Sequence, residues 1–170
     1  MGDGGQSPVV TQSVTYVTGL MCYLSPRTFM TNLGHLYSDQ HRYDEAQPLY
    51  ERALSIQEKA LGPNHPELAA ILKKLGQLHY DQDRYAQAEP FYKRALKIDE
   101  KVHGPDQAEV AKGLNNLANI YTVTGRCDEA EPLFKRALVI WEKASCPNDS
   151  CLAASLIGLA IVYDIQGRYV

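Results

Sequence analysis

The sequence predicts an all-α protein, built as a solenoid of antiparallel helix pairs with about three and a half repeats. Two observations in the 170 residues lead to this fold class. Residues of the same kind recur 42 positions apart, and each copy contains two stretches whose apolar residues are spaced by three and four. A fixed period of this length is typical of repeat architectures, and spacing by three and four is that of one helix face.

The 42-residue period is visible in several independent sets of positions. A leucine, a small residue and an aromatic residue hold their places from copy to copy, and two alanines recur in the same phase. The sets are Leu33, Leu75, Leu117 and Leu159; Gly34, Gly76, Ala118 and Ala160; Ala46, Ala88 and Ala130; Ala53, Ala95 and Ala137; and Tyr50, Tyr92 and Phe134. Small residues beside an aromatic ring predict helices that approach closely.

These patterns place the helix pairs along the chain. We expect helices at 25–40 and 44–61, at 66–82 and 86–103, and at 108–124 and 128–145, with a seventh at about 150–166. Left-handed turn positions are expected at Gly125 and Gly167, and at His41 and Asp83 in the earlier copies. The repeats then span about 25–65, 66–107, 108–149 and, in part, 150–170. Residues 1–24 lie outside the repeat and are expected to be a poorly ordered lead-in.

Composition excludes several classes of function. The net charge is −3 and the pI about 5.9, so a basic nucleic-acid-binding surface is not expected. The four cysteines follow no metal-ligand spacing and favour a reducing, cytoplasmic setting. No phosphate-binding loop or paired carboxylate indicates an enzyme, so we expect no catalytic residue, cofactor or metal, and no membrane span. His79 is interpreted as a packing residue, and Trp141 as partly exposed on the outer wall.

The sequence resembles the tetratricopeptide repeat proteins, specifically the 42-residue kinesin light chain and nephrocystin type. The resemblance covers about residues 25–170 and is carried by the phrases ALGPNHPELA (60–69), EVAKGLNNLANIY (109–121) and EAEPLFKRAL (129–138). It implies a right-handed superhelix in which the first helix of each pair lines a concave groove. It also implies that asparagines on that face, Asn116 and Asn119 here, grip extended acidic peptides.

The expected groove positions combine positive charge with amide groups, which can both donate and accept hydrogen bonds. The predicted peptide-binding residues are Asn32, His35, Lys73, Lys74, Gln77, Tyr80, Lys112, Asn115, Asn116 and Asn119, and Thr122 is expected on the same face. We therefore predict a scaffold for protein–protein interaction that holds an extended, acidic partner segment. Two alternatives stay open. The chain could stack or self-associate as part of a longer array, through its last helix, or be the sensor arm of a larger signalling protein.

Overall fold

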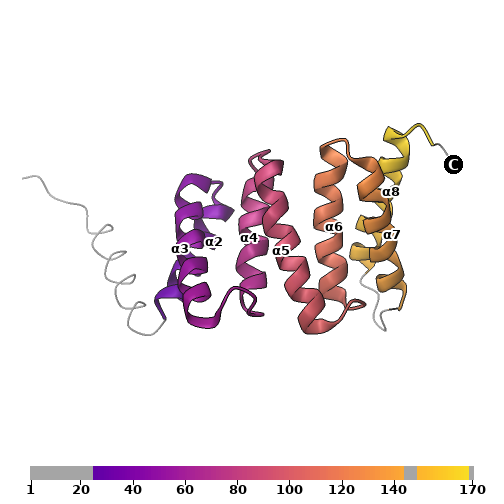
Figure 1. The fold of residues 1–170 in the computed structure, drawn as a ribbon. Helices are drawn as coiled ribbons and strands as arrows, with labels where there is room; N and C mark the ends of the chain where they lie inside the picture. Colours follow the sequence, from indigo (N-terminus) through magenta and orange to yellow (C-terminus); the bar gives the residue numbers. More distant parts are fainter. Residues whose placement is uncertain (1–24, 144–148, 169–170) are drawn as a thin grey trace, which may run out of the picture. The chain divides into compact units, whose positions relative to one another are not determined.

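The computed structural model describes residues 25–143 and 149–168, and every regular element in these ranges is a helix (Figure 1). The helices are α2 (Pro26–Asp39), α3 (Tyr43–Leu61), α4 (Leu68–Tyr80), α5 (Tyr85–His103), α6 (Ala108–Val123), α7 (Cys127–Lys143) and α8 (Asp149–Ile165). The all-α prediction is confirmed, and each expected helix is present with closely similar bounds. The expected lead-in, 1–24, lies outside the described residues.

The chain divides into two compact units, residues 1–57 and residues 58–170. In the first unit, α2 begins with the Ser25 side chain accepting a hydrogen bond from the Thr28 amide, and Pro26 is the first helical residue. The ring of Tyr50 from α3 lies over Gly34 of α2, where an added methyl group would come within 2.8 Å of the ring. Glycine therefore permits the close approach of these two helices.

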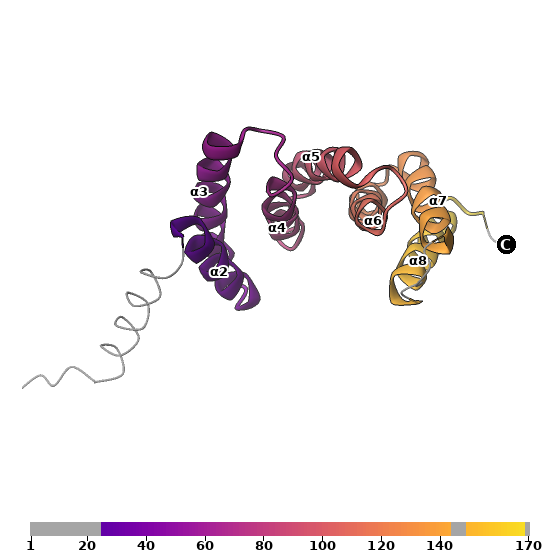
Figure 2. The same ribbon diagram turned by 90° about the horizontal axis from the view of Figure 1, so that it is seen from below.

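In the second unit the helices alternate between two rows. Figure 2 shows α4, α6 and α8 in one row and α5 and α7 in the other. Helix α5 packs against both α4 and α6, and α8 packs against both α6 and α7. Since neighbouring helices along the chain are antiparallel, α4, α6 and α8 run in the same direction. The row of α4, α6 and α8 contains the first helix of each pair, which the repeat predicts to line the groove, and is called the inner row below.

The turns inside the helix pairs have the predicted left-handed geometry. The φ angles are 75° at Gly125 and 66° at Gly167, and they are 58° at His41 and 57° at Asp83. A side chain in this conformation costs about 1 kcal/mol or more relative to glycine. The repeat therefore retains the turn geometry even in the two copies that have no glycine at this position.

The core of the second unit rests on the small residues of the repeat. Ala88 and Ala130 are completely buried, and a methyl group added at Gly76 would lie only 3.0 Å from the Tyr92 ring. His79 is buried and stacks on Phe91, with 5.4 Å between ring centroids, which confirms its interpretation as a packing residue. At Gly76 the small residue thus allows the Tyr92 ring to approach the helix backbone closely.

Two sets of polar contacts join successive copies. Arg136 of α7 binds Glu100 of α5 at 2.7 Å and the Pro105 carbonyl at 3.1 Å, and Arg94 binds Glu58 and the Pro63 carbonyl in the same way one copy earlier. In the second set an arginine just after the left-handed turn lies over an aromatic ring and binds a glutamate of the preceding copy. Its members are Arg126, Tyr121 and Glu89, and Arg168, Tyr163 and Glu131.

Candidate functional site

A hollow of about 160 Å³ lies on the inner row of the second unit. It is lined by Gln77, Tyr80, Tyr92, Asn116 and Asn119. Gln77 and Tyr80 are three residues apart on α4, and Asn116 and Asn119 are three apart on α6, so each pair lies on one helix face. Tyr92 reaches the hollow from α5 and is almost fully buried. The structure therefore brings together four of the ten residues that the sequence predicts for peptide binding.

The Gln77 side chain, which lines the hollow, is already held by hydrogen bonds to its neighbours. The Gln77 side-chain N–H donates to Asp81 at 2.6 Å, and the Tyr92 hydroxyl donates to the Gln77 side-chain oxygen at 3.1 Å. Burial raises the pKa of Tyr92, so its hydroxyl stays a neutral donor at physiological pH. Gln77 still has one N–H and one lone pair to offer. Its orientation is fixed by two neighbours, which reduces the entropy lost when a ligand binds.

Asn116 and Asn119 supply further hydrogen-bonding groups. Asn119 is exposed and Asn116 half-buried, and neither side chain hydrogen-bonds to another residue in the described ranges. Each amide has two donors and a carbonyl oxygen, which match the alternating N–H and C=O groups of an extended backbone. The two amides can hydrogen-bond to a peptide main chain whatever side chains the peptide carries.

The three lysines expected in the groove are not equivalent. Lys74 and Lys112 are exposed, and the Lys112 ammonium lies 3.5 Å from Glu109. Lys73 instead forms an ion pair with Asp99 of α5, at 2.7 Å, with its side chain 27% exposed and that of Asp99 4% exposed. A groove ligand would therefore have to compete with Asp99 for the Lys73 ammonium, and the role of Lys73 in peptide binding stays a prediction. Its ammonium is held by a buried carboxylate of the neighbouring outer helix.

Two other expected groove residues, and one residue expected on the outer wall, also take part in packing. The Asn115 side-chain N–H donates to the Ser155 hydroxyl at 2.7 Å and links α6 to α8. Thr122 is buried and donates to the Ala118 carbonyl at 2.9 Å, so its place in the groove was predicted wrongly. Trp141 is 3% exposed, and the prediction that it stands partly exposed on the outer wall is wrong as well. Both corrections have one physical reason, because packing within the solenoid covers Thr122 and Trp141.

Asn32 and His35 belong to α2, in the first unit. Asn32 is exposed, whereas His35 is half-buried with its ring 5.6 Å from that of Tyr50. Sequence reasoning missed Tyr92 as part of the hollow, since its place in the repeat marks it only as a packing ring. The hydroxyl of Tyr92 could have indicated its place in the hollow, because the hydroxyl of a buried tyrosine needs a hydrogen-bond partner.

Neither a membrane-spanning helix nor a metal-binding cluster is found in the described part of the chain. None of the helices there combines the length and apolar character needed to cross a membrane. Nor do residues 25–143 and 149–168 hold a group of three or more His, Cys, Asp or Glu side chains placed to bind a metal ion.

Known proteins share this architecture. Among solved structures, BtubC (BKLC) from P. vanneervenii is 28% identical, with a TM-score of 0.78 over 84% of this chain and 57% of that one. A putative kinesin light chain from Podosopora anserina, with nearly identical TPR-like repeats, is 23% identical with a TM-score of 0.73, over 84% of this chain and 69% of that one. A second structure of that protein, with a single substitution, is 22% identical with a TM-score of 0.74, over 85% and 69%. This chain thus spans little more than half the length of BtubC.

No curated protein matches the chain. A family model described as "Tetratricopeptide repeat" matches residues 26–101 and 109–170, which is most of the sequence. The helix pairs, the left-handed turns and the small residues beneath the aromatic rings agree with that match. The chain belongs to the tetratricopeptide repeat family.

Proposed function

We propose that this chain binds an extended, acidic segment of a partner protein across α4 and α6. Tetratricopeptide repeats are general modules for protein–protein interaction. The observation that carries the finer proposal is the hollow lined by Gln77, Asn116 and Asn119. Side-chain amides that converge from two parallel helices suit a peptide backbone that crosses both of them. The cytoplasmic location expected from the cysteines stays a prediction.

The position of the exposed lysines supports an acidic ligand. Lys74 precedes Gln77 by one turn on α4, and Lys112 precedes Asn116 by one turn on α6. Since the two helices run in the same direction, both ammonium groups lie toward the same end of the inner row. Helix N-termini also carry partial positive charge at that end. A carboxylate of the ligand placed there would meet two lysines while the peptide backbone occupies the hollow.

Charge reversal of the two exposed lysines tests the acidic preference. We expect the Lys74→Glu, Lys112→Glu variant to bind a fluorescein-labelled Ser–Glu repeat peptide about 10-fold more weakly, because two partly exposed contacts together amount to roughly 1–2 kcal/mol. The matched control is Lys97→Glu, Lys101→Glu, which makes the same charge change at exposed positions of α5. Moderate salt should weaken the parent's binding, and it should not weaken that of the double variant, whose glutamates repel the peptide.

A second variant tests the backbone contact. Asn116→Ala removes one amide from the hollow. It should therefore lower the affinity for the Ser–Glu peptide and the affinity for a Ser–Gln peptide by a similar factor. Anisotropy titrations of both peptides measure this. If the charge-reversed and control variants bind the Ser–Glu peptide equally, or if Asn116→Ala changes neither affinity, the ligand does not lie across α4 and α6.

Self-association is a second candidate function, favoured by the apolar surface of α8. Leu156, Ile157, Ile161 and Ile165 are all about half exposed, with Ile157 at 60%. Two copies of the chain that pair these surfaces would remove them from water. An Ile157→Glu, Ile161→Glu variant should then shift sedimentation from dimer to monomer without loss of helical signal. A parent that sediments as a monomer over the same concentrations would exclude this function.

A further inference from the structure

Two aromatic rings of the second copy have no counterpart in the third. Tyr80 at the end of α4 and Tyr85 at the start of α5 pack edge to face, with ring centroids 5.3 Å apart. The Tyr85 hydroxyl donates to the carboxylate of Asp83. The positions 42 residues later are Thr122 and Cys127. The third copy therefore has the same turn and the same helix ends without either ring.

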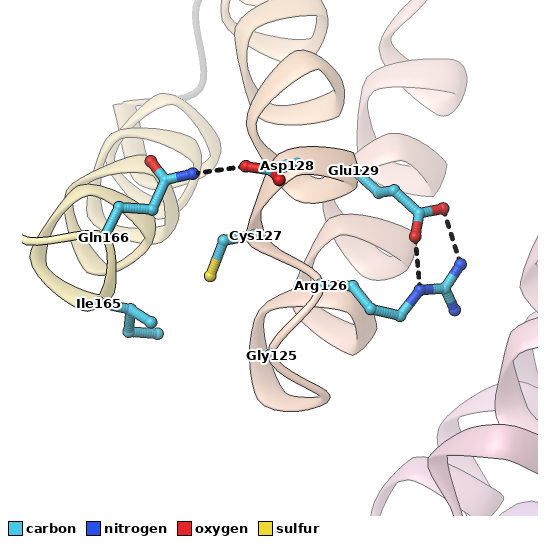
Figure 3. Close-up of a pocket in the computed structure, with 7 residues that line it drawn as sticks. All are labelled: Gly125, Arg126, Cys127, Asp128, Glu129, Ile165 and Gln166. Carbon is cyan, nitrogen blue, oxygen red and sulfur yellow. Dashed lines mark hydrogen bonds and ion pairs between the residues drawn. The ribbon is translucent and has the colours of Figure 1, made fainter.

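A hollow of about 360 Å³ lies beside the position that lacks the ring (Figure 3). It is lined by Gly125, Arg126, Cys127, Asp128, Glu129, Ile165 and Gln166. Cys127 is 7% exposed, and Figure 3 shows it between Ile165 and Gln166 of the α8 end and the turn that leads into α7. An apolar cavity of about 150 Å³ is already large enough to bind benzene. This hollow is open to solvent and lined mostly by polar residues, and its volume has room for one aromatic ring that enters from outside.

The polar groups around the hollow match a phenol. Asp128 accepts a hydrogen bond from Gln166 at 3.0 Å, which leaves its carboxylate with further acceptor capacity at the rim. Arg126 is held by Glu129 at 2.7 Å and lies over the Tyr121 ring, so its position is fixed. In the second copy the Tyr85 hydroxyl binds Asp83, whose place in the third copy is taken by Gly125. A ring in this hollow would instead have Asp128, a carboxylate of the lining, as the acceptor for its hydroxyl.

We propose that this hollow binds a single tyrosine side chain of a partner protein. The ring would contact Ile165 and Cys127, and its hydroxyl would donate to Asp128. The proposal is independent of the peptide groove on α4 and α6, because it uses the turn between α6 and α7 and the end of α8. Failure of one proposal therefore leaves the other standing.

The thiol of Cys127 offers a direct measurement. p-Cresol has the atoms of the tyrosine side chain and serves as the probe, and 4-methylcyclohexanol is the control of the same size without an aromatic ring. Iodoacetamide alkylation of Cys127 and Cys151 is followed by mass spectrometry in the intact chain. We expect p-cresol at about its dissociation constant, on the order of 1 mM for so small a ligand, to halve the rate at Cys127 only. Equal protection by 4-methylcyclohexanol, or none by p-cresol, would overturn the proposal.

Filling the hollow provides a second measurement that does not need the thiol. Cys127→Tyr restores the residue of the other copies and should abolish the saturation-transfer NMR signal of p-cresol. Cys127→Ser keeps the hollow open and should retain that signal. A p-cresol signal that persists in a folded Cys127→Tyr variant places the ligand elsewhere and refutes the site. A signal lost in both variants refutes it as well, because the serine leaves the space unchanged.

Discussion

Replacing Lys73 by methionine tests whether this lysine stabilises the fold or binds the peptide ligand. The Lys73 ammonium lies 2.7 Å from a carboxylate oxygen of Asp99, whose side chain is almost fully buried. Methionine keeps most of the side-chain volume and removes the charge. The carboxylate of Asp99 would then stay in the interface between α4 and α5 without its cation. We expect a loss of stability and no direct loss of peptide affinity.

The size of the loss follows from the geometry. At 2.7 Å, two unit charges attract by about 6 kcal/mol at an effective dielectric constant of about 20. The cost of removing both groups from water offsets much of this attraction. Removal of one partner from a fully buried pair costs about 3–5 kcal/mol, and water that reaches the partly exposed lysine lowers this to about 2–3 kcal/mol. At about 4 °C per kcal/mol, the Tm should fall by about 8–12 °C.

Thermal melts followed by circular dichroism measure this loss, with Lys74→Met as the matched control. Lys74 is the next residue on α4 and is exposed, so its variant should melt like the parent and bind the Ser–Glu peptide more weakly. The double variant Lys73→Met, Asp99→Leu should recover most of the stability, because it leaves no unpaired charge. If Lys73→Met melts like the parent and loses peptide affinity as Lys74→Met does, Lys73 is a groove residue and the ion pair is unimportant.

Two other predictions concern packing and acid stability. Ala88 is completely buried, so Ala88→Leu should lower the free energy of unfolding by about 1–3 kcal/mol in urea titrations, whereas Gln87→Leu at the exposed neighbouring position should not; equal losses would refute the helix register. The hydrogen bond from Lys135, followed by that from Arg168, lowers the pKa of Glu131. Its stabilising effect is therefore complete above the ordinary glutamate pKa of about 4.3 and lost as the pH falls through the lower folded value. Glu131→Gln should show less loss of the urea midpoint between pH 7 and pH 3 than the parent; equal pH dependence would contradict this.

The fold could be predicted from the sequence because its determinants repeat. The small residue at Gly76, the ring at Tyr92 and the alanine at Ala88 recur every 42 residues, so chance agreement is averaged out over the copies. The left-handed turns were also predictable at His41 and Asp83, where the residue type alone would not indicate them. Their phase relative to Gly125 and Gly167 identified them. The position of a residue within the 42-residue repeat was thus enough to predict the local structure.

The site was only partly predictable, because register places a residue on a helix face and does not say what meets it there. Gln77, Asn116 and Asn119 line the hollow as their phase suggests. Lys73 has the phase of Asn115, yet the first binds Asp99 on its own outer helix and the second binds Ser155 on the next inner helix. The partners are far away in the sequence. Only the three-dimensional structure shows whether such a side chain contacts the outer helix of its own pair or the next inner helix.

Candidate contacts with other molecules lie where the copies of this chain differ. Positions that repeat faithfully, such as the ring of Tyr92 against Gly76, are occupied in packing and turn only the end of the side chain toward the surface. Some of the positions that vary leave a group without an internal partner or leave space, whereas others, such as that of Lys73 and Asn115, are occupied in packing. Asn116 has the phase of Gly158, which packs against Phe134, whereas the Asn116 amide lines the hollow on α4 and α6. Cys127 has the phase of Tyr85, and the second hollow lies beside this smaller side chain. In a solenoid whose copies share one framework, a departure from the repeat that creates unfilled volume or an unused hydrogen-bonding group identifies a candidate contact with another molecule.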